Sequence, residues 1–272
     1  MSVLPENTLE TPDGRILHCR MNGPADARRV IVVVHGLGEH SGWYSEFVTR
    51  MADQHTATLI YDQHGHGKSP GRRGDAPGMQ TLLDDIAVAL DRAIERWPDA
   101  EPLLLGHSLG GHLVLRYLLE CRQPLRRAVV TNPMILPDNP PTKPQAFAAW
   151  LTAKCIPRFR LSTDIEPTEL TQDRDILEEL ADDPLAHEKL SIGIGGTLMS
   201  SGHELLERAD AIQAELLMLL GGDDTLCDRG STKTFADRVP RCDKIVFERL
   251  KHNLLLEKAR SDVYDQLINW LG

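Results

Sequence analysis

The segment Gly106-His107-Ser108-Leu109-Gly110 constrains the fold of this chain more than any other feature. A serine with a glycine two residues before it and two after it has the spacing of a strained turn between a strand and a helix. The backbone on the two sides of such a turn passes so close that only glycine fits. An apolar run at residues 101–105 precedes the motif, and apolar residues at helical spacing follow it over residues 111–119. Strand, turn and helix therefore occur in the required order.

A second segment, Gly67-Lys68-Ser69-Pro70-Gly71, has the same spacing. In this motif the residue after the nucleophile donates its backbone N–H to the developing oxyanion. Pro70 has no N–H to donate, whereas Leu109 has one. No helical pattern follows Gly71 either. We therefore assign Ser108, and not Ser69, as the candidate nucleophile.

Length and composition limit the class of protein. The 272 residues suffice for one large domain with a sizeable core, and the net charge of −10 argues against nucleic acid as a partner. No apolar segment approaches the roughly 18 residues of a membrane span, and the first residues lack a secretory signal pattern. The cysteines are odd in number and show no paired spacing, so we expect reduced thiols in the cytoplasm. They are Cys19, Cys121, Cys155, Cys227 and Cys242.

Apolar runs alternate with helical patterns along the chain. An unbroken β-branched run at residues 30–34 is typical of a strand buried on both faces, and Asp13-Gly14 predicts an N-terminal hairpin between residues 8–11 and 16–21. Strands alternating with helices indicate an α/β fold with a mostly parallel sheet and helices on both faces. The other predicted strands are 57–61, 128–131, 216–220 and 244–248, with long helices at 82–97 and 253–271.

This alternation breaks between residues 133 and 206, where five prolines fall within residues 133–144. Short helical patterns follow at 145–154, 177–181 and 190–205, with no strong strand pattern. We predict an α/β core from residues 1–132 and 207–272, with a helical cap from residues 133–206 over the carboxyl ends of the strands. Phe147, Trp150 and Leu151 form an apolar face in the first cap helix, for which both core packing and lipid contact remain open.

A serine nucleophile needs a base and an acid that orients the base. In this fold class the acid and then the histidine follow the serine along the chain, each just past a strand. Asp223 and Asp224 follow the predicted strand at 216–220, and His252 follows the last predicted strand. By order and position both aspartates are candidates for the acid, and His252 is the candidate base.

The second oxyanion donor is expected in the loop after the strand at residues 30–34. We assign it to the backbone N–H of Leu37, paired with the N–H of Leu109. The histidines around this loop, His35, His40, His64 and His66, lack further ligands at metal-binding spacing. We therefore predict neither a metal nor a cofactor.

Three segments resemble the monoacylglycerol lipases, which are α/β-hydrolases close to the lysophospholipase and serine-aminopeptidase-like group. They are His35-Gly36-Leu37-Gly38-Glu39-His40-Ser41, Tyr61-Asp62-Gln63-His64-Gly65-His66-Gly67-Lys68-Ser69 and Gly106-His107-Ser108-Leu109-Gly110-Gly111. The segment Asp224-Thr225-Leu226-Cys227-Asp228 is similar to the family's acid segment, and this favours Asp224 over Asp223. The resemblance covers about residues 10–272. It implies an eight-stranded sheet with a cap inserted after the sixth strand.

The resemblance also implies hydrolysis of a fatty acyl ester of a small alcohol, without a cofactor, and a cap that can rest on a lipid surface. Glu39 matches a polar residue of the family's glycerol pocket, while Trp43 and Leu255 stand where arginine and histidine are common. We place these three residues and His107 in the substrate pocket. The alcohol specificity stays open because of the two departures.

We therefore expect a serine hydrolase of monoacylglycerols or related lysolipids, cytoplasmic or peripheral at a membrane surface. A general carboxylesterase and an amidase or aminopeptidase of the same fold are alternatives. From another class, a non-catalytic ligand receptor on this fold is a further alternative.

Overall fold

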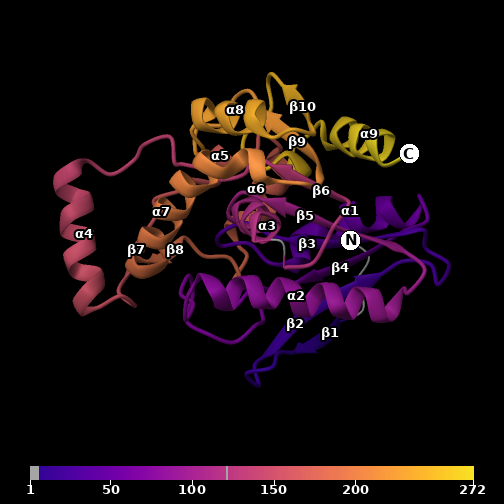
Figure 1. Cartoon of the computed structure of the whole chain (residues 1–272), viewed down its shortest axis with the longest axis horizontal. Coiled ribbons are helices and arrows are strands. Elements are labelled where there is room, and N and C mark those ends of the chain that lie inside the picture. Colours follow the sequence, from indigo (N-terminus) through magenta and orange to yellow (C-terminus); the bar gives the residue numbers. More distant parts are fainter. Residues whose placement is uncertain (1–5, 121) are drawn as a thin grey trace.

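A computed structural model describes residues 6–120 and 122–272, so Cys121 lies outside the described part. Its centre is an eight-stranded sheet with strand order β1-β2-β4-β3-β5-β6-β9-β10 (Figure 1). β1 and β2 form the predicted antiparallel hairpin, and the strands from β4 to β10 are parallel. The strands are β1 (Glu6–Glu10), β2 (Ile16–Asn22), β3 (Arg29–Val34), β4 (Thr56–Tyr61), β5 (Glu101–His107), β6 (Arg127–Thr131), β9 (Glu215–Gly221) and β10 (Cys242–Phe247). The prediction of a mostly parallel sheet is confirmed.

Helices cover both faces of this sheet because its central strands are apolar on both sides. Along β3, Val32 belongs to the hydrophobic cluster between the sheet and the helices on one face. Val33 belongs to the hydrophobic cluster on the other face. The first face carries α2 (Met79–Arg96), α3 (Leu109–Leu119) and α8 (Arg229–Arg238), and the second carries α1 (Ser45–Ala52) and α9 (Arg260–Leu271). Within the described residues, no helix combines the length and the apolar composition needed to cross a membrane.

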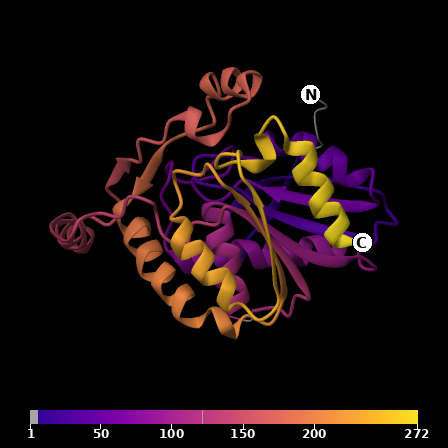
Figure 2. The same ribbon diagram turned by 90° about the horizontal axis from the view of Figure 1, so that it is seen from above.

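A long insertion separates β6 from β9. It contains α4 (Lys143–Cys155), β7 (Arg160–Ser162), α5 (Pro167–Leu170), α6 (Arg174–Ala181), β8 (Lys189–Ser191) and α7 (Ile192–Arg208). In both views α4 lies at the outer edge of the molecule (Figures 1 and 2). The ring of His112 on α3 pairs with the hydroxyl of Ser201 on α7 at 2.8 Å, and this contact joins the insertion to the core. The side chains of Phe147 and Trp150 lie outside the described part.

Two sequence-based expectations need correction. The insertion contains a small antiparallel sheet, β7 with β8, where we expected only helices. Its three-residue strands are too short to show the period-two pattern that reveals a strand. The last helix starts at Arg260 and not at residue 253. The N–H of Asn253 donates to the carbonyl of Leu170, and residues 254–256 form a 3₁₀ turn, so this segment is committed to contacts outside the helix.

Gly110 gives a test of the close packing that this fold requires. A Cβ at this position would lie 1.9 Å from the backbone oxygen of Val34 and 2.5 Å from that of His35. Neither backbone atom can move without displacing β3. We expect Gly110→Ala to lower the free energy of unfolding by about 3 kcal/mol or more, the upper range for overpacked cores.

The matched control is Gly196→Ala, an exposed position in α7 where a Cβ would have no neighbour within 4 Å. The same exchange there should raise the stability by about 1 kcal/mol, since alanine is the better helix former. Urea unfolding of both variants measures these changes in the free energy of unfolding. Equal changes at positions 110 and 196 would contradict the packing argument.

Candidate active site

Ser108 lies at the sharp turn between β5 and α3, with φ 51° and ψ −117°. Few residues other than glycine adopt a positive φ, so the surrounding structure must hold this one. The N–H of Ser108 donates to the carbonyl of Thr131, and its own carbonyl accepts from the N–H groups of His112 and Met134. The side chain is half-buried. The turn thus presents a serine hydroxyl at the carboxyl end of the sheet, as the sequence predicted.

Asp224 and His252 meet beyond the ends of β9 and β10. The Nδ1–H of His252 donates to Oδ2 of Asp224 at 2.9 Å, and both side chains are buried. The other carboxylate oxygen, Oδ1, accepts from the N–H groups of Leu226 and Cys227. Burial alone would raise the pKa of Asp224, but the His252 ring and the two N–H donors lower it below its usual value. Asp223, the competing candidate, is exposed.

Asn132 connects this pair to the serine turn, and the sequence analysis missed it. Its Nδ2 donates to the carbonyls of His252 at 2.6 Å and Lys251 at 3.2 Å, and its Oδ1 accepts from the N–H of Gly221. It also has a positive φ of 40°. Because it directly follows Thr131, which accepts from the N–H of Ser108, one segment fixes all three loops. A polar residue at the carboxyl end of a buried strand is the signal that could have revealed it.

Glu39 is buried under the loop that follows β3, with 2% of its surface exposed. Its Oε2 accepts from the N–H of Gly36 at 2.9 Å and from the hydroxyl of Tyr44 at 2.6 Å. Its Oε1 accepts from Nδ2 of Asn253 at 2.7 Å and lies 3.4 Å from Nε2 of His107. Burial would raise the pKa of Glu39, but His107 and the hydrogen-bond donors lower it. The carboxylate therefore ties the predicted oxyanion loop to the segment that carries His252.

His107 is fully buried between this carboxylate and the histidine of the candidate site. Its ring lies 4.9 Å from the ring of His252, centre to centre, and its Nδ1 contacts Thr131. Burial lowers the pKa of His107 to about 4, although Glu39 acts in the opposite direction. His107 is consequently neutral at pH 7.

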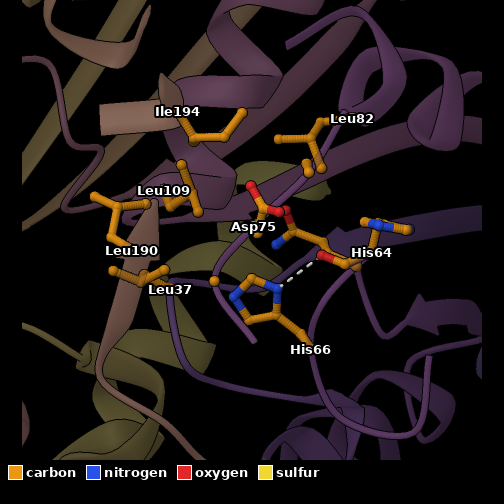
Figure 3. A pocket seen from close by; sticks show the side chains of 11 residues that line it. Leu37, His64, His66, Asp75, Leu82, Leu109, Leu190 and Ile194 are labelled. Atoms are coloured by element: carbon orange, nitrogen blue, oxygen red, sulfur yellow. Dashed lines mark hydrogen bonds between the residues drawn. The ribbon is translucent and has the colours of Figure 1, made fainter. Parts of the chain in front are cut away.

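The remaining predicted site residues lie in three places. Trp43 donates its Nε1–H to Oδ2 of Asp183 at 2.6 Å, so it connects the core to the insertion. Leu255 is 2% exposed and packs in the core cluster beside α9. Leu37 and Leu109, the predicted oxyanion residues, line the same small pocket (Figure 3).

Ser69, in the second glycine-serine motif, lies near a histidine and an aspartate of its own. Its Oγ donates to the carbonyl of Asp62 at 2.5 Å and accepts from the backbone N–H of His18 at 2.9 Å. The imidazole of His18 pairs with the carboxylate of Asp62 at 3.1 Å. With its hydrogen committed to a backbone carbonyl, this hydroxyl supports the loop after β4.

One group of described side chains offers potential metal ligands. Asp224, Cys227 and His252 have ligand atoms within 4.8 Å of one another. A cysteine binds metal as the thiolate. Burial raises the pKa of the Cys227 thiol well above its ordinary value, and Asp224 adds to this effect. The donor set therefore fits an aspartate–histidine pair with a neutral thiol beside it better than it fits a metal.

Comparison with known proteins gives a family. Residues 25–259 match the sequence profile of the family described as serine aminopeptidase, S33. The chain is 31% identical over 249 residues to a putative monoglyceride lipase of Schizosaccharomyces pombe, covering 87% of this chain and 65% of that protein. It is 25% identical over 260 residues to a monoacylglycerol lipase of Mycolicibacterium smegmatis, covering 94% and 92%.

Some relatives are much longer. The chain spans 26% of a Dictyostelium discoideum abhydrolase domain-containing protein with which it is 30% identical. Among solved structures, a Paleococcus ferrophilus monoacylglycerol lipase superimposes with a TM-score of 0.85 at 24% identity, covering 94% of this chain and 98% of that one. At this identity the likeness shows a shared α/β-hydrolase fold.

Glu39→Gln tests the internal carboxylate. The amide would present an NH₂ group where the carboxylate now accepts only, so a donor would face the donors of Gly36, Tyr44 or Asn253. A buried donor or acceptor left unpaired costs about 1–3 kcal/mol. We expect a loss of this size in the free energy of unfolding at pH 7, measured by urea denaturation.

Glu178→Gln is the control, because Glu178 is exposed on α6. It should change stability by less than about 0.5 kcal/mol. A Glu39→Gln variant as stable as this control would mean that the carboxylate does not support the loop.

Proposed function

We propose that this chain, which belongs to the serine aminopeptidase S33 family of α/β-hydrolases, cleaves carboxylic esters, above all monoacylglycerols or related lysolipids. Ser108 is the proposed nucleophile, His252 the base and Asp224 the acid that orients it. The observation that carries the proposal is the buried His252–Asp224 hydrogen bond, which is joined through Asn132 to the strained turn of Ser108.

The chemistry follows from the hydrogen-bond pattern. Asp224 can only accept at Oδ2, so the hydrogen of neutral His252 resides on Nδ1 and its Nε2 is left with a free lone pair. Nε2 takes the proton of Ser108 as Oγ attacks the ester carbonyl, and later gives it to the leaving alcohol. Water then cleaves the acyl-enzyme by the same route. The N–H groups of Leu37 and Leu109 are the proposed donors to the tetrahedral oxyanion.

The substrate class is argued from relatives. Proteins named monoglyceride lipase or monoacylglycerol lipase match this chain over most of its length. The family description, serine aminopeptidase, favours peptide amides as a second candidate class. An aminopeptidase must bind a substrate ammonium group. Around the proposed nucleophile the buried carboxylates Glu39 and Asp224 are already hydrogen-bonded within the protein, which favours the ester.

Ser108→Ala should lower kcat/KM for p-nitrophenyl butyrate by about 10⁴-fold or more, because the acyl-enzyme can no longer form. Ser69→Ala is the control, and it should retain both hydrolysis and labelling by a fluorophosphonate. The wild-type protein should also be assayed on a panel of monoacyl, diacyl and lysophospholipid substrates, and on amides with the same acyl groups.

Normal turnover by Ser108→Ala would refute the nucleophile. Faster cleavage of amides than of matched esters would reassign the protein as an aminopeptidase. An unlabelled Ser108 in the wild-type protein would favour a ligand receptor.

We also propose that the insertion touches a lipid surface through four apolar side chains. Leu151, Ile156, Phe159 and Leu161 are each about half exposed, and they follow one another from the end of α4 into β7. Large apolar side chains exposed together mark contact surfaces. α4, which carries Leu151, lies at the outer edge of the molecule in both ribbon views (Figures 1 and 2).

Phe159→Ser combined with Leu151→Ser should lower the fraction of protein that sediments with phosphatidylcholine vesicles on the order of tenfold, given the apolar area removed. Ile16→Thr, an equally exposed apolar residue on β2, should leave sedimentation unchanged. Equal binding of the double variant and the wild type would exclude this surface.

A further inference from the structure

The loop that carries His252 is bound to the insertion through its backbone. The N–H of His252 donates to the carbonyl of Glu169 at 3.4 Å, and the N–H of Asn253 donates to the carbonyl of Leu170 at 2.8 Å. Glu169 and Leu170 are the last two residues of α5. The end of a helix leaves carbonyl groups without partners inside the helix, so α5 has these two acceptors to offer. The insertion therefore supports the proposed base directly.

A buried carboxylate completes this junction. Glu257 is 1% exposed, and its Oε1 accepts from the N–H of Lys251, the residue before His252, at 2.8 Å. Its Oε2 accepts from the N–H of Gln172 at 3.0 Å and lies 3.2 Å from Oγ1 of Thr171. Hydrogen bonds to a carboxylate are stronger than those between neutral groups. One oxygen thus binds the His252 loop, and the other binds the insertion just after α5.

Other contacts hold the same two segments together. The side-chain amide of Gln172 donates to the carbonyl of Arg249 at 2.6 Å, and Nζ of Lys251 donates to the carbonyl of Thr168 at 2.5 Å. Leu256 packs in an apolar cluster with two side chains of α6. This part of the insertion, residues 168–172, is consequently fixed to the core beside the His252 loop.

The backbone of His252 is thereby held on both sides. Its carbonyl accepts from Nδ2 of Asn132 at 2.6 Å, while its own N–H and that of Lys251 are bound at the junction. The ring is held separately, by its hydrogen bond to Asp224. Proton transfer needs the base within hydrogen-bond reach of the serine, and a displacement of about 1 Å can cost a factor on the order of 10² in rate. A group that fixes this backbone therefore affects the rate.

We propose that Glu257 is a positioning residue for His252, an inference that rests on the proposed ester hydrolysis. Its two oxygens keep the N–H of Lys251 and the N–H of Gln172 in one place, and this fixes the His252 loop relative to the insertion. Because Glu257 is buried, it acts through His252 and not on the substrate. The insertion thus takes part in catalysis and does not only cover the site.

The first test uses Glu257→Gln, which keeps the shape of the side chain but replaces one acceptor oxygen by an NH₂ donor. Whichever way the amide turns, its NH₂ group faces the N–H of Lys251 or that of Gln172, so one of the two hydrogen bonds is lost. Hydrogen–deuterium exchange followed by mass spectrometry measures this loss without any turnover. We expect exchange in residues 249–257 and 168–173 to accelerate by about tenfold, while peptides from β5 and β9 keep wild-type rates.

Glu178→Gln, at an exposed position of α6, is the matched control and should exchange at wild-type rates. Wild-type exchange in Glu257→Gln would overturn the proposal, because the carboxylate would then not hold the junction. Faster exchange throughout the molecule would overturn it as well, since Glu257 would then support the whole fold and not this loop in particular.

The second test separates positioning of the base from substrate binding. In Glu257→Gln we expect kcat for p-nitrophenyl butyrate to fall by about tenfold, with KM within about twofold of wild type, because the ester still binds while the base is misplaced. The rate at which a fluorophosphonate labels Ser108 should fall by the same factor, and Glu178→Gln should keep both rates. An unchanged kcat, or a loss that appears in KM alone, would contradict the positioning role.

Thr171→Val is a milder second variant, for the case that Glu257→Gln does not fold. It keeps the volume of the side chain but removes the hydroxyl beside Oε2 of Glu257. We expect kcat to fall by about threefold at unchanged KM, the effect of one weakened hydrogen bond. Wild-type kcat in this variant would count against the proposal.

The two tests also separate this inference from the proposed function. A wild-type protein that neither hydrolyses the ester nor reacts with the fluorophosphonate would refute the proposed function. The exchange measurement reports on the junction alone, because it is independent of turnover.

Discussion

The close approach of the serine turn to strand β3 is the constraint on which the rest of the site depends. A Cβ on Gly106 would lie 2.4 Å from the backbone oxygen of Gly110, and one on Gly110 would lie 1.9 Å from that of Val34. With no side chain at either position, the start of α3 lies directly against the end of β3. The loop after β3 therefore begins next to the turn, which brings Leu37 and Leu109 to one pocket. The same contact thus strains Ser108 and places both predicted oxyanion residues.

The sequence predicted the parts of the molecule that local patterns determine. Apolar runs such as residues 30–34 identify strands buried on both faces, and the structure confirms that they build one mostly parallel sheet. Parallel strands end at a common edge, so the polar residues after them were expected to meet. Asp224 and His252 do meet there, and the exposed Asp223 does not take part. Their catalytic roles stay a prediction.

What the sequence could not provide depends on partners distant along the chain. The position of Asn132 after a buried strand could have marked it as a candidate, but not its partners, because His252 and Gly221 lie 120 and 89 residues away. The start of the last helix was misplaced for a similar reason, because Asn253 bonds to Leu170 in the insertion. Glu39 was found through a resemblance, but its three internal donors required the structure.

Burial also keeps two histidines of this region uncharged. Burial lowers the pKa of His107 more than Glu39 raises it, and burial together with the neighbouring His35 and His187 lowers the pKa of His66. In the proposed reaction His252 must become positively charged beside His107, whose ring is only 4.9 Å away. A charged His107 would oppose that step by repulsion, whereas a neutral one does not. Asp224, hydrogen-bonded to Nδ1 of His252, is placed to stabilise the positive charge that the proposed reaction puts on that ring. The proposed reaction therefore assigns proton transfer to His252 and not to its buried neighbour His107.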